Sequence, residues 1–227
     1  MKPQNIGTTE KAVLVFVFAI LLAGFILFQV NLQAFETYIM EDGLVEWLTV
    51  LGLLAGAWIC FVRFARLRNR RNWKFLAITL GLGLLLVVAA GEEISWGQRI
   101  LGIKSSEFFE KNNAQGETNL HNLVVGGVKL NRLIFSFGLI AVMAIYLLII
   151  PFIYKKKEGF RRWLDSIGVM IPQNYQVISI LVVFALSETI RHGKRAELLE
   201  AGIALLFFLI IAYPHNKHIY NHNQISA

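Results

Sequence analysis

Six long apolar runs divide this chain, and they constrain its fold more than any other feature. They cover roughly residues 11–33, 44–65, 75–97, 131–154, 174–191 and 197–213. A helix needs about 20 apolar residues to cross the hydrocarbon core of a bilayer, and each run is near that length. The sequence therefore predicts an all-α fold, a polytopic integral membrane bundle of about six transmembrane helices.

The composition agrees with a single transmembrane domain over residues 1–227. The chain is 56% hydrophobic and only 16% charged, whereas about a quarter of the residues of a soluble domain are charged. The formal net charge of +7 does not indicate a nucleic-acid partner, because the basic residues lie in short runs beside the apolar runs. That placement is typical of membrane proteins, so the expected partners are lipids and not nucleic acid.

Two basic segments predict the orientation of the bundle. One lies between the second and third apolar runs, from Arg63 to Lys74, and the other lies between the fourth and fifth, from Lys155 to Arg162. Cytoplasmic loops of membrane proteins carry an excess of lysine and arginine. We therefore expect both segments, and with them the N- and C-termini, on the cytoplasmic side of a multi-pass protein.

A long connection, residues 98–130, follows the third run on the opposite, outer side. Connections of this length inside a compact protein are uncommon and usually functional or disordered, and the apolar content of this one argues against disorder. Two alternatives stay open. The loop lies on the outer membrane surface, or it dips back into the membrane as a re-entrant segment, which requires surrounding protein or a water-filled cavity.

With this topology, most acidic residues gather on one side of the bilayer. Twelve of the fifteen fall at outer helix ends or in outer loops. Acidic residues contribute little to the orientation of a membrane protein, so the asymmetry is independent of the basic loops and indicates a site. The twelve are Glu36, Glu41, Asp42, Glu46, Glu92, Glu93, Glu107, Glu110, Glu117, Glu188, Glu197 and Glu200.

The segment GEEISWGQR, residues 91–99, is the strongest candidate for the centre of that site, because an apolar run continues directly into paired carboxylates. Ionisable groups at the margin of a span are costly and indicate function by default. If the helix continues, Glu92, Ser95, Trp96 and Arg99 share one face and Glu93 points about 100° away. The alternative is a helix end that emerges into water, with Trp96 as an interfacial anchor.

Two short segments, ETNLH at 117–121 and ETIRH at 188–192, suggest metal ligands. If each is helical, Glu117 with His121 and Glu188 with His192 are neighbours at i, i+4. Carboxylate and imidazole are usual ligands of zinc and non-haem iron. We predict that Glu93, His121, Glu188 and His192 hold a divalent metal such as zinc. The alternative is that each histidine only bonds its neighbouring glutamate.

The segments GEEISWGQR and ETNLHN resemble a set of bacterial inner-membrane proteins that carry GEExSWGQR-like and NLHN-like signatures. The resemblance covers the central third of the chain; it implies the bacterial inner (cytoplasmic) membrane and no particular activity. Glu92 and Glu93 are also loosely similar to the glutamate pair of CAAX-protease-like membrane hydrolases. That likeness stops at the pair, since Gly97 stands where the family has its arginine.

These patterns predict a membrane-embedded, metal-dependent hydrolase or transferase that acts on a lipid or lipid-linked substrate at the outer leaflet. The metal would activate water for attack on an ester, amide or phosphoester. Glu92 would be the general base, and Arg99 or Arg191 would stabilise the anion. Two other classes stay open: a proton-coupled transporter, in which membrane carboxylates relay protons, and a non-enzymatic scaffold or accessory subunit.

Overall fold

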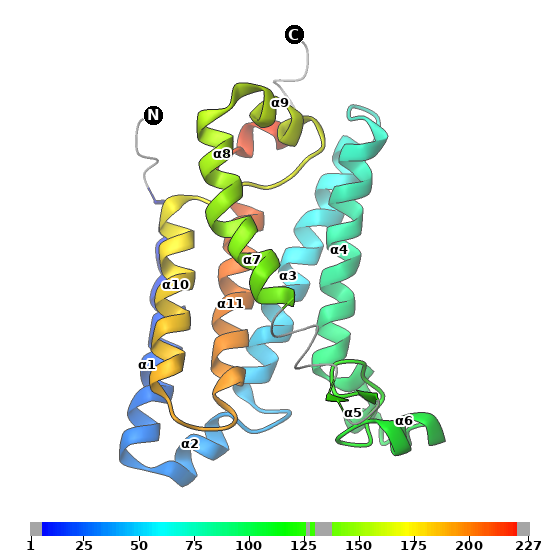
Figure 1. Ribbon diagram of the computed structural model, residues 1–227, viewed down its shortest axis with the longest axis vertical. Coiled ribbons are helices and arrows are strands. Elements are labelled where there is room, and N and C mark those ends of the chain that lie inside the picture. The colour runs from blue at the N-terminus through cyan, green and yellow to red at the C-terminus, as the bar shows by residue number, and fades with distance from the viewer. Residues whose placement is uncertain (1–5, 126–127, 130–137, 222–227) are drawn as a thin grey trace.

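The computed structural model describes residues 6–125, 128–129 and 138–221 (Figure 1). It confirms the prediction of a helical protein. Its described residues include one pair of two-residue antiparallel strands, β1 (Val124–Val125) and β2 (Val128–Lys129), in the connection 98–130, which we call the outer loop after its predicted side. The helical elements are α1 (Thr8–Val30), α2 (Leu32–Tyr38), α3 (Leu44–Leu67), α4 (Trp73–Glu93), η1 (Ser95–Gly97), α5 (Gln98–Leu101), α6 (Glu107–Asn112), α7 (Leu139–Ala144), η3 (Ile145–Ile149), α8 (Ile150–Lys156), α9 (Glu158–Ser166), α10 (Asn174–Thr189), α11 (Arg195–Ala212) and η4 (Lys217–Tyr220).

Within the described part of the chain, four helical segments are long and apolar enough to cross a membrane, which confirms that the chain is suited to a bilayer. They are α1, α3, α4 and the continuous stretch from α7 through η3 to α8, Leu139–Lys156. The first part of the predicted fourth run, residues 131–137, lies outside the described residues. Helix α10 is apolar but shorter, with 16 residues, so a total of six crossings stays a prediction.

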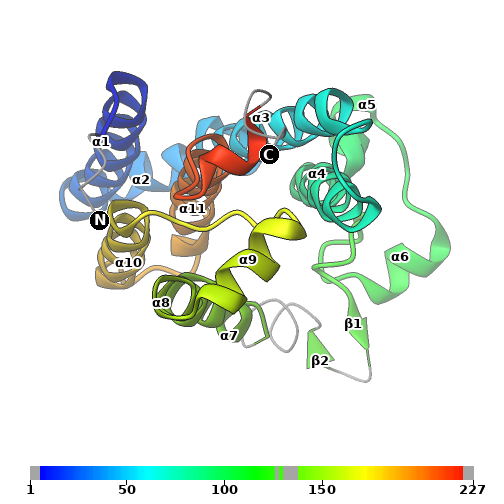
Figure 2. The ribbon, with the colours of Figure 1, turned by 90° about the horizontal axis from the view of Figure 1, so that it is seen from above.

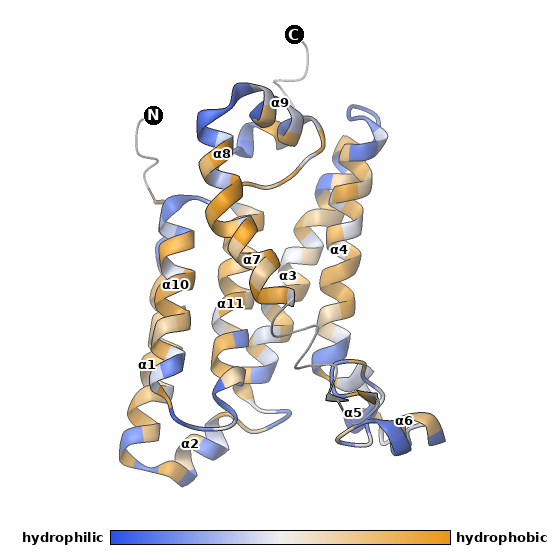
Figure 3. Cartoon of the chain, viewed as in Figure 1, coloured by the Kyte–Doolittle hydropathy of each residue, from blue (hydrophilic) through white to orange (hydrophobic). Residues whose placement is uncertain are grey.

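The two ends of the bundle differ in charge. The α3–α4 turn, α9, η4 and the start of α1 lie at one end, whereas α2, α5, α6 and the α10–α11 turn lie at the other (Figure 1). Hydrophilic residues concentrate at both ends and apolar residues between them (Figure 3). We call the first the basic end, after residues 68–74 and 155–162, and the second the acidic end, after residues 36–46, 92–121 and 188–200.

Helix α11 forms the centre of the bundle and packs against α3, α10 and α1 (Figure 2). Leu198, Leu206 and Leu209 on this helix have no exposed surface. Its contact with α3 is close because Gly52 has no side chain: a Cβ atom there would lie 3.0 Å from the backbone carbonyl carbon of Ala204. Small residues of this kind allow membrane helices to approach each other closely, and α4 then packs on the same helix α3.

Arg63 ties α3 to α11 at the basic end. Its guanidinium group donates hydrogen bonds to the backbone oxygens of Ile211, at 2.5 Å, and Ala212, at 3.1 Å. These carbonyls belong to the last turn of α11, where helical carbonyls need an outside donor and where a cation is favoured by the helix dipole. The guanidinium also lies 4.1 Å from the ring centre of Tyr220. Helices α3 and α11 are thus held together near the basic end.

Filling the contact at Gly52 should loosen the bundle. We expect Gly52→Leu to lower the free energy of unfolding in detergent by about 1–3 kcal/mol, because the added side chain has to push the α11 backbone away. The matched control is Gly81→Leu on α4, where no atom lies within 4 Å of an added Cβ. Equal losses in the two variants would contradict the close packing of α3 on α11.

Candidate functional site

The acidic end owes its shape to a tight turn that follows α4. The sequence predicts a helix that continues to residue 97, but α4 ends at Glu93. Ser95, Trp96 and Gly97 then all have positive φ angles, of 45°, 56° and 75°. Residues with a side chain rarely adopt this conformation; it costs of the order of 1–3 kcal/mol each and concentrates at functional sites. Glu92 and Arg99 therefore do not share one continuous helix face.

The turn directs Arg99 into a group of three carboxylates, which we call the Arg99 clamp. Arg99 Nε lies 2.8 Å from Asp42 Oδ2, Nη2 lies 2.6 Å from Glu46 Oε1, and Nη1 lies 2.9 Å from Glu117 Oε2. The side chain of Glu46 is only 4% exposed. Burial by itself would lower the pKa of Arg99, but hydrogen bonds to Asp42 and Glu117 raise it above its usual range. The predicted anion-stabilising group is thus engaged with the protein's own carboxylates.

A buried polar network extends from the clamp into the outer loop. Ser95 donates its hydroxyl hydrogen to Glu117 and accepts a hydrogen bond from Asn119 Nδ2 at 2.8 Å. Asn113 Nδ2 donates to the side-chain oxygen of Asn119 at 2.8 Å. Gln98 Oε1 accepts from the backbone N–H of residue 118 at 2.7 Å. These contacts join the GEEISWGQR and ETNLHN segments, which the sequence singled out separately, into one structure.

Glu92 and His121 form the second feature of the site. Glu92 Oε2 accepts two hydrogen bonds from backbone N–H groups, those of Leu120 at 2.5 Å and His121 at 3.2 Å. Its other oxygen, Oε1, accepts a hydrogen bond from Trp96 Nε1 at 3.0 Å. The ring atom Nδ1 of His121 lies 3.7 Å from Glu92 Oε2, and Nε2 lies 3.0 Å from Asn122 Nδ2. Burial lowers the pKa of His121, and the charge of Glu92 opposes that shift.

Glu93 belongs to another group of carboxylates, between α3, α4 and α11. It interacts electrostatically with Glu197 and Glu46 as well as with Glu92, and Glu200 interacts with Glu93 and Glu197. The sequence placed Glu197 and Glu200 on the acidic side but gave them no part in the site. The signal that could have found them is their i, i+3 spacing, which puts both side chains on the same side of a helix.

The second ETxxH segment does not contribute to the Glu92–His121 pair. Helix α10 ends at Thr189, so Glu188 and His192 are not neighbours on one helix. Glu188 pairs with Arg195 at 3.0 Å, and His192 Nε2 lies 3.5 Å from Glu36. Arg191, the other predicted anion stabiliser, is exposed in the α10–α11 turn.

The helical i, i+4 spacing expected for the first ETxxH segment is also absent, because Glu117 and His121 lie in the non-helical part of the loop. Among the residues that the structure describes, no three histidine, cysteine, aspartate or glutamate side chains gather as a metal site would require. The structure thus does not bring Glu93, His121, Glu188 and His192 together as one ligand set. Binding of a divalent metal stays a prediction.

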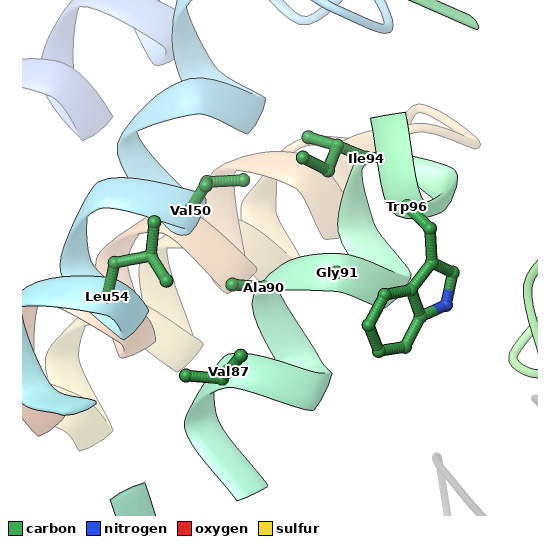
Figure 4. Close-up of a pocket in the computed structure, with 7 residues that line it drawn as sticks. All are labelled: Val50, Leu54, Val87, Ala90, Gly91, Ile94 and Trp96. Carbon is green, nitrogen blue, oxygen red and sulfur yellow. The ribbon is translucent and has the colours of Figure 1, made fainter. Parts of the chain in front are cut away.

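An apolar hollow of about 240 Å³ lies between α3 and α4 (Figure 4), and one residue links it to the Glu92–His121 pair. Trp96 connects the two: its ring lines the hollow, and its Nε1 donates to Glu92. The ring of Trp96 can lie against α4 because residue 91 is glycine; a Cβ atom on residue 91 would lie only 2.8 Å from that ring. The lining residues are Val50, Leu54, Val87, Ala90, Gly91, Ile94 and Trp96.

Removing the guanidinium of the clamp should destabilise the protein strongly. We expect Arg99→Leu to lower the free energy of unfolding by about 3 kcal/mol, because Glu46 would be left as a buried, uncompensated charge. Arg195→Leu is the matched control: Arg195 and Glu188 are both more than 40% exposed, and such pairs contribute less than about 1 kcal/mol. Equal losses, measured by denaturation in detergent, would contradict the role of the clamp.

Comparisons of the chain with protein-family models, with curated proteins and with solved structures found no match. The resemblance of GEEISWGQR and ETNLHN to bacterial inner-membrane proteins therefore stays a prediction. The function has to be argued from the clamp, the Glu92–His121 pair and the hollow.

Proposed function

We propose that this protein is a membrane-embedded hydrolase or transferase that acts on a lipid or lipid-linked substrate at the outer leaflet. One observation carries the proposal: a carboxylate–histidine pair, Glu92 and His121, lies beside an apolar hollow at the end of a helix suited to cross the membrane. A carboxylate that orients an imidazole is a recurring arrangement for general base catalysis. Apolar pockets with a few convergent polar groups are the usual form of a small-molecule site.

The proposed mechanism gives Glu92 and His121 separate roles. Three N–H groups hold the carboxylate of Glu92 in place, and its charge favours the tautomer of His121 that carries the proton on Nδ1. Nε2, which in this tautomer accepts from Asn122 Nδ2, is the base once water or an acceptor hydroxyl takes the place of that amide. It takes the proton while the oxygen attacks an ester, amide or phosphoester; the bond to the leaving group then breaks, and Nε2 returns the proton to the leaving alkoxide or amine. Water as the nucleophile gives a hydrolase, and an acceptor hydroxyl gives a transferase. The general base in this mechanism is therefore His121, whereas the sequence predicted Glu92.

The hollow supports a lipid as the substrate. Its lining is apolar and aromatic and reaches from Leu54 on α3 to Trp96 at the acidic end. An acyl chain in the hollow would lie against the ring of Trp96, which contacts Glu92 through Nε1. The polar part of the same molecule would then be at the level of the Glu92–His121 pair. The substrate proposed is thus an amphiphile whose scissile bond lies near its apolar chain.

The proposal includes six crossings. Four are the segments long and apolar enough to cross a membrane, and α10 and α11 are the other two. The proposal places the basic end in the cytoplasm, because both basic segments and the start of α1 lie there together (Figure 1) and cytoplasmic loops carry the excess of lysine and arginine. The acidic end then faces outward. By the resemblance stated above, the membrane would be the inner membrane of a bacterium.

A proton-coupled carrier is the second candidate, and one observation favours it. Glu46, Glu93, Glu197 and Glu200 interact electrostatically between three helices, and carboxylates inside a bundle are typical of proton pathways. All four lie toward the acidic end, however, whereas a pathway needs polar groups through the membrane depth. A pure scaffold is favoured less, because Glu92 and His121 contact each other and do not point apart into water.

A comparison of two histidine variants tests the proposal. Purified protein would be incubated with liposomes of a total bacterial lipid extract, and lipids consumed and formed would be measured by mass spectrometry. We expect His121→Asn to lower the rate by about 10²–10⁴-fold, the usual contribution of a general base. The control, His192→Asn, should keep the rate, because His192 lies in the α10–α11 turn and pairs with Glu36 of α2, not with Glu92.

Loss of the rate in both variants, together with bound zinc in the wild-type protein by elemental analysis, would support the predicted metal set and contradict His121 as a metal-free base. A lipid profile that the wild-type protein leaves unchanged would contradict the proposed function itself.

The pH dependence of the reaction gives an independent check. His121 is a base only when it is neutral, and burial lowers its pKa below the usual value of about 6.5. We therefore expect the rate to fall with decreasing pH only below that value. Glu92→Gln removes a charge that raises the pKa of His121, so the acid limb should move to still lower pH at a reduced maximal rate. A shift of the acid limb to higher pH in Glu92→Gln would contradict the interaction of Glu92 with His121.

A further inference from the structure

The outer loop carries apolar side chains that the site does not use, on the same segment as Arg99 and Gln98. We call this segment, residues 98–112, the outer arm; it comprises α5, a turn at Gly102 and α6. Four large apolar residues on it are each more than half exposed: Ile100, Leu101, Ile103 and Phe108. Exposed apolar side chains that gather in this way indicate an interaction surface.

Helix α6 has two different faces. Glu107, Glu110 and Lys111 share one side at i, i+3 and i+4, and Glu107 pairs with Lys111 at 3.5 Å. Phe108 lies about 100° away from Glu107 around the helix, and its ring packs edge-on against Phe109. This is the pattern of a helix that lies in a membrane–water interface, with an apolar face toward the acyl chains and a charged face toward water.

The position of the outer arm fits an interface. Helix α4 has 21 residues, which at about 1.5 Å per residue matches the thickness of a hydrocarbon core. Exposed tryptophans, Trp73 and Trp96, stand near its two ends, as is usual at the two membrane–water boundaries. The arm begins at Gln98, only a few residues after α4, and α6 projects sideways from the bundle (Figures 1 and 2).

The arm also continues a surface that already faces lipid. Leu84, Leu85 and Val88 on α4 are large apolar residues with exposed side chains, and in a bilayer such side chains of a membrane-spanning helix contact acyl chains. Ile100 and Leu101 add exposed apolar side chains a few residues beyond the end of α4. Lys104 is exposed within the arm, where an ammonium group can reach lipid phosphates.

We infer that the outer arm is a membrane-binding surface that lies in the outer interface, with Ile100, Leu101, Ile103 and Phe108 among the lipids and the Glu107–Lys111 side in water. The occupant of this apolar surface is the bilayer itself. The inference goes beyond the proposed function and does not depend on it, because it holds for any reaction at Glu92 and His121. It also selects between the two alternatives for the loop: this part lies on the membrane surface and is not re-entrant.

Site-directed fluorescence tests the inference on the full chain. Phe108→Cys and Glu110→Cys would be labelled with an environment-sensitive thiol dye and reconstituted into phospholipid nanodiscs with or without lipids spin-labelled near the head group. The native Cys60 has no exposed surface, so the wild-type protein serves as the unlabelled control. We expect the dye at residue 108 to be quenched several-fold more by the spin-labelled lipid, and several-fold less by aqueous iodide, than the dye at residue 110.

The pair of positions is matched, because both lie on α6 and their side chains point to nearly opposite sides of it, about 160° apart. Ile103→Cys is the second lipid-facing position and should behave like Phe108→Cys. Equal, strong quenching by iodide at 103, 108 and 110 would overturn the inference, because the arm would then stand in water. Protection of residue 108 from both quenchers would also overturn it, since a protein surface would then cover the arm in place of lipid.

Discussion

The arrangement of the acidic end depends on one guanidinium group. Arg99 is bound by Asp42 and Glu46 from the start of α3, and by Glu117 from the outer loop, so a single side chain joins three segments that are distant in sequence. Glu46 is buried, and a buried carboxylate without a partner is costly. If the loop moved away together with Arg99, the buried carboxylate of Glu46 would lose its partner. Because this is unfavourable, the long non-helical segment is kept in one conformation.

The clamp explains how an unfavourable backbone conformation persists next to it. Ser95 and Trp96 have positive φ angles, and such strain is retained only where the surroundings determine it. Ser95 is completely buried and bonded to Glu117 and Asn119, so relaxing the turn would break the polar network. The same network holds the backbone N–H of His121 against Glu92. The geometry of the Glu92–His121 pair is thus a consequence of the clamp.

The sequence was sufficient for the features that depend on local pattern. Apolar runs predicted α1, α3 and α4 within a few residues, because hydropathy and length decide where a helix fits a bilayer. It was insufficient at residues 94–99, where Gly97 is only a weak local signal against a helix and the turn is stabilised by contacts from Glu117 and Asn119, about twenty residues away. The same holds for His121: a helical spacing was assumed, but the histidine reaches Glu92 from a loop.

The fold explains some of the acidic residues and not others, depending on whether the carboxylate lies at the start or at the end of its helix. Glu46 and Glu197 lie in the first turns of α3 and α11, where free N–H groups and the helix dipole stabilise a negative charge. Glu92 and Glu93 lie in the last turn of α4, where the same dipole opposes them. Glu92 needs three N–H donors from outside its helix, and Glu93 lies next to Glu197. The fold alone does not explain why Glu92 and Glu93 stand at this helix end, and this supports a role for them in the chemistry.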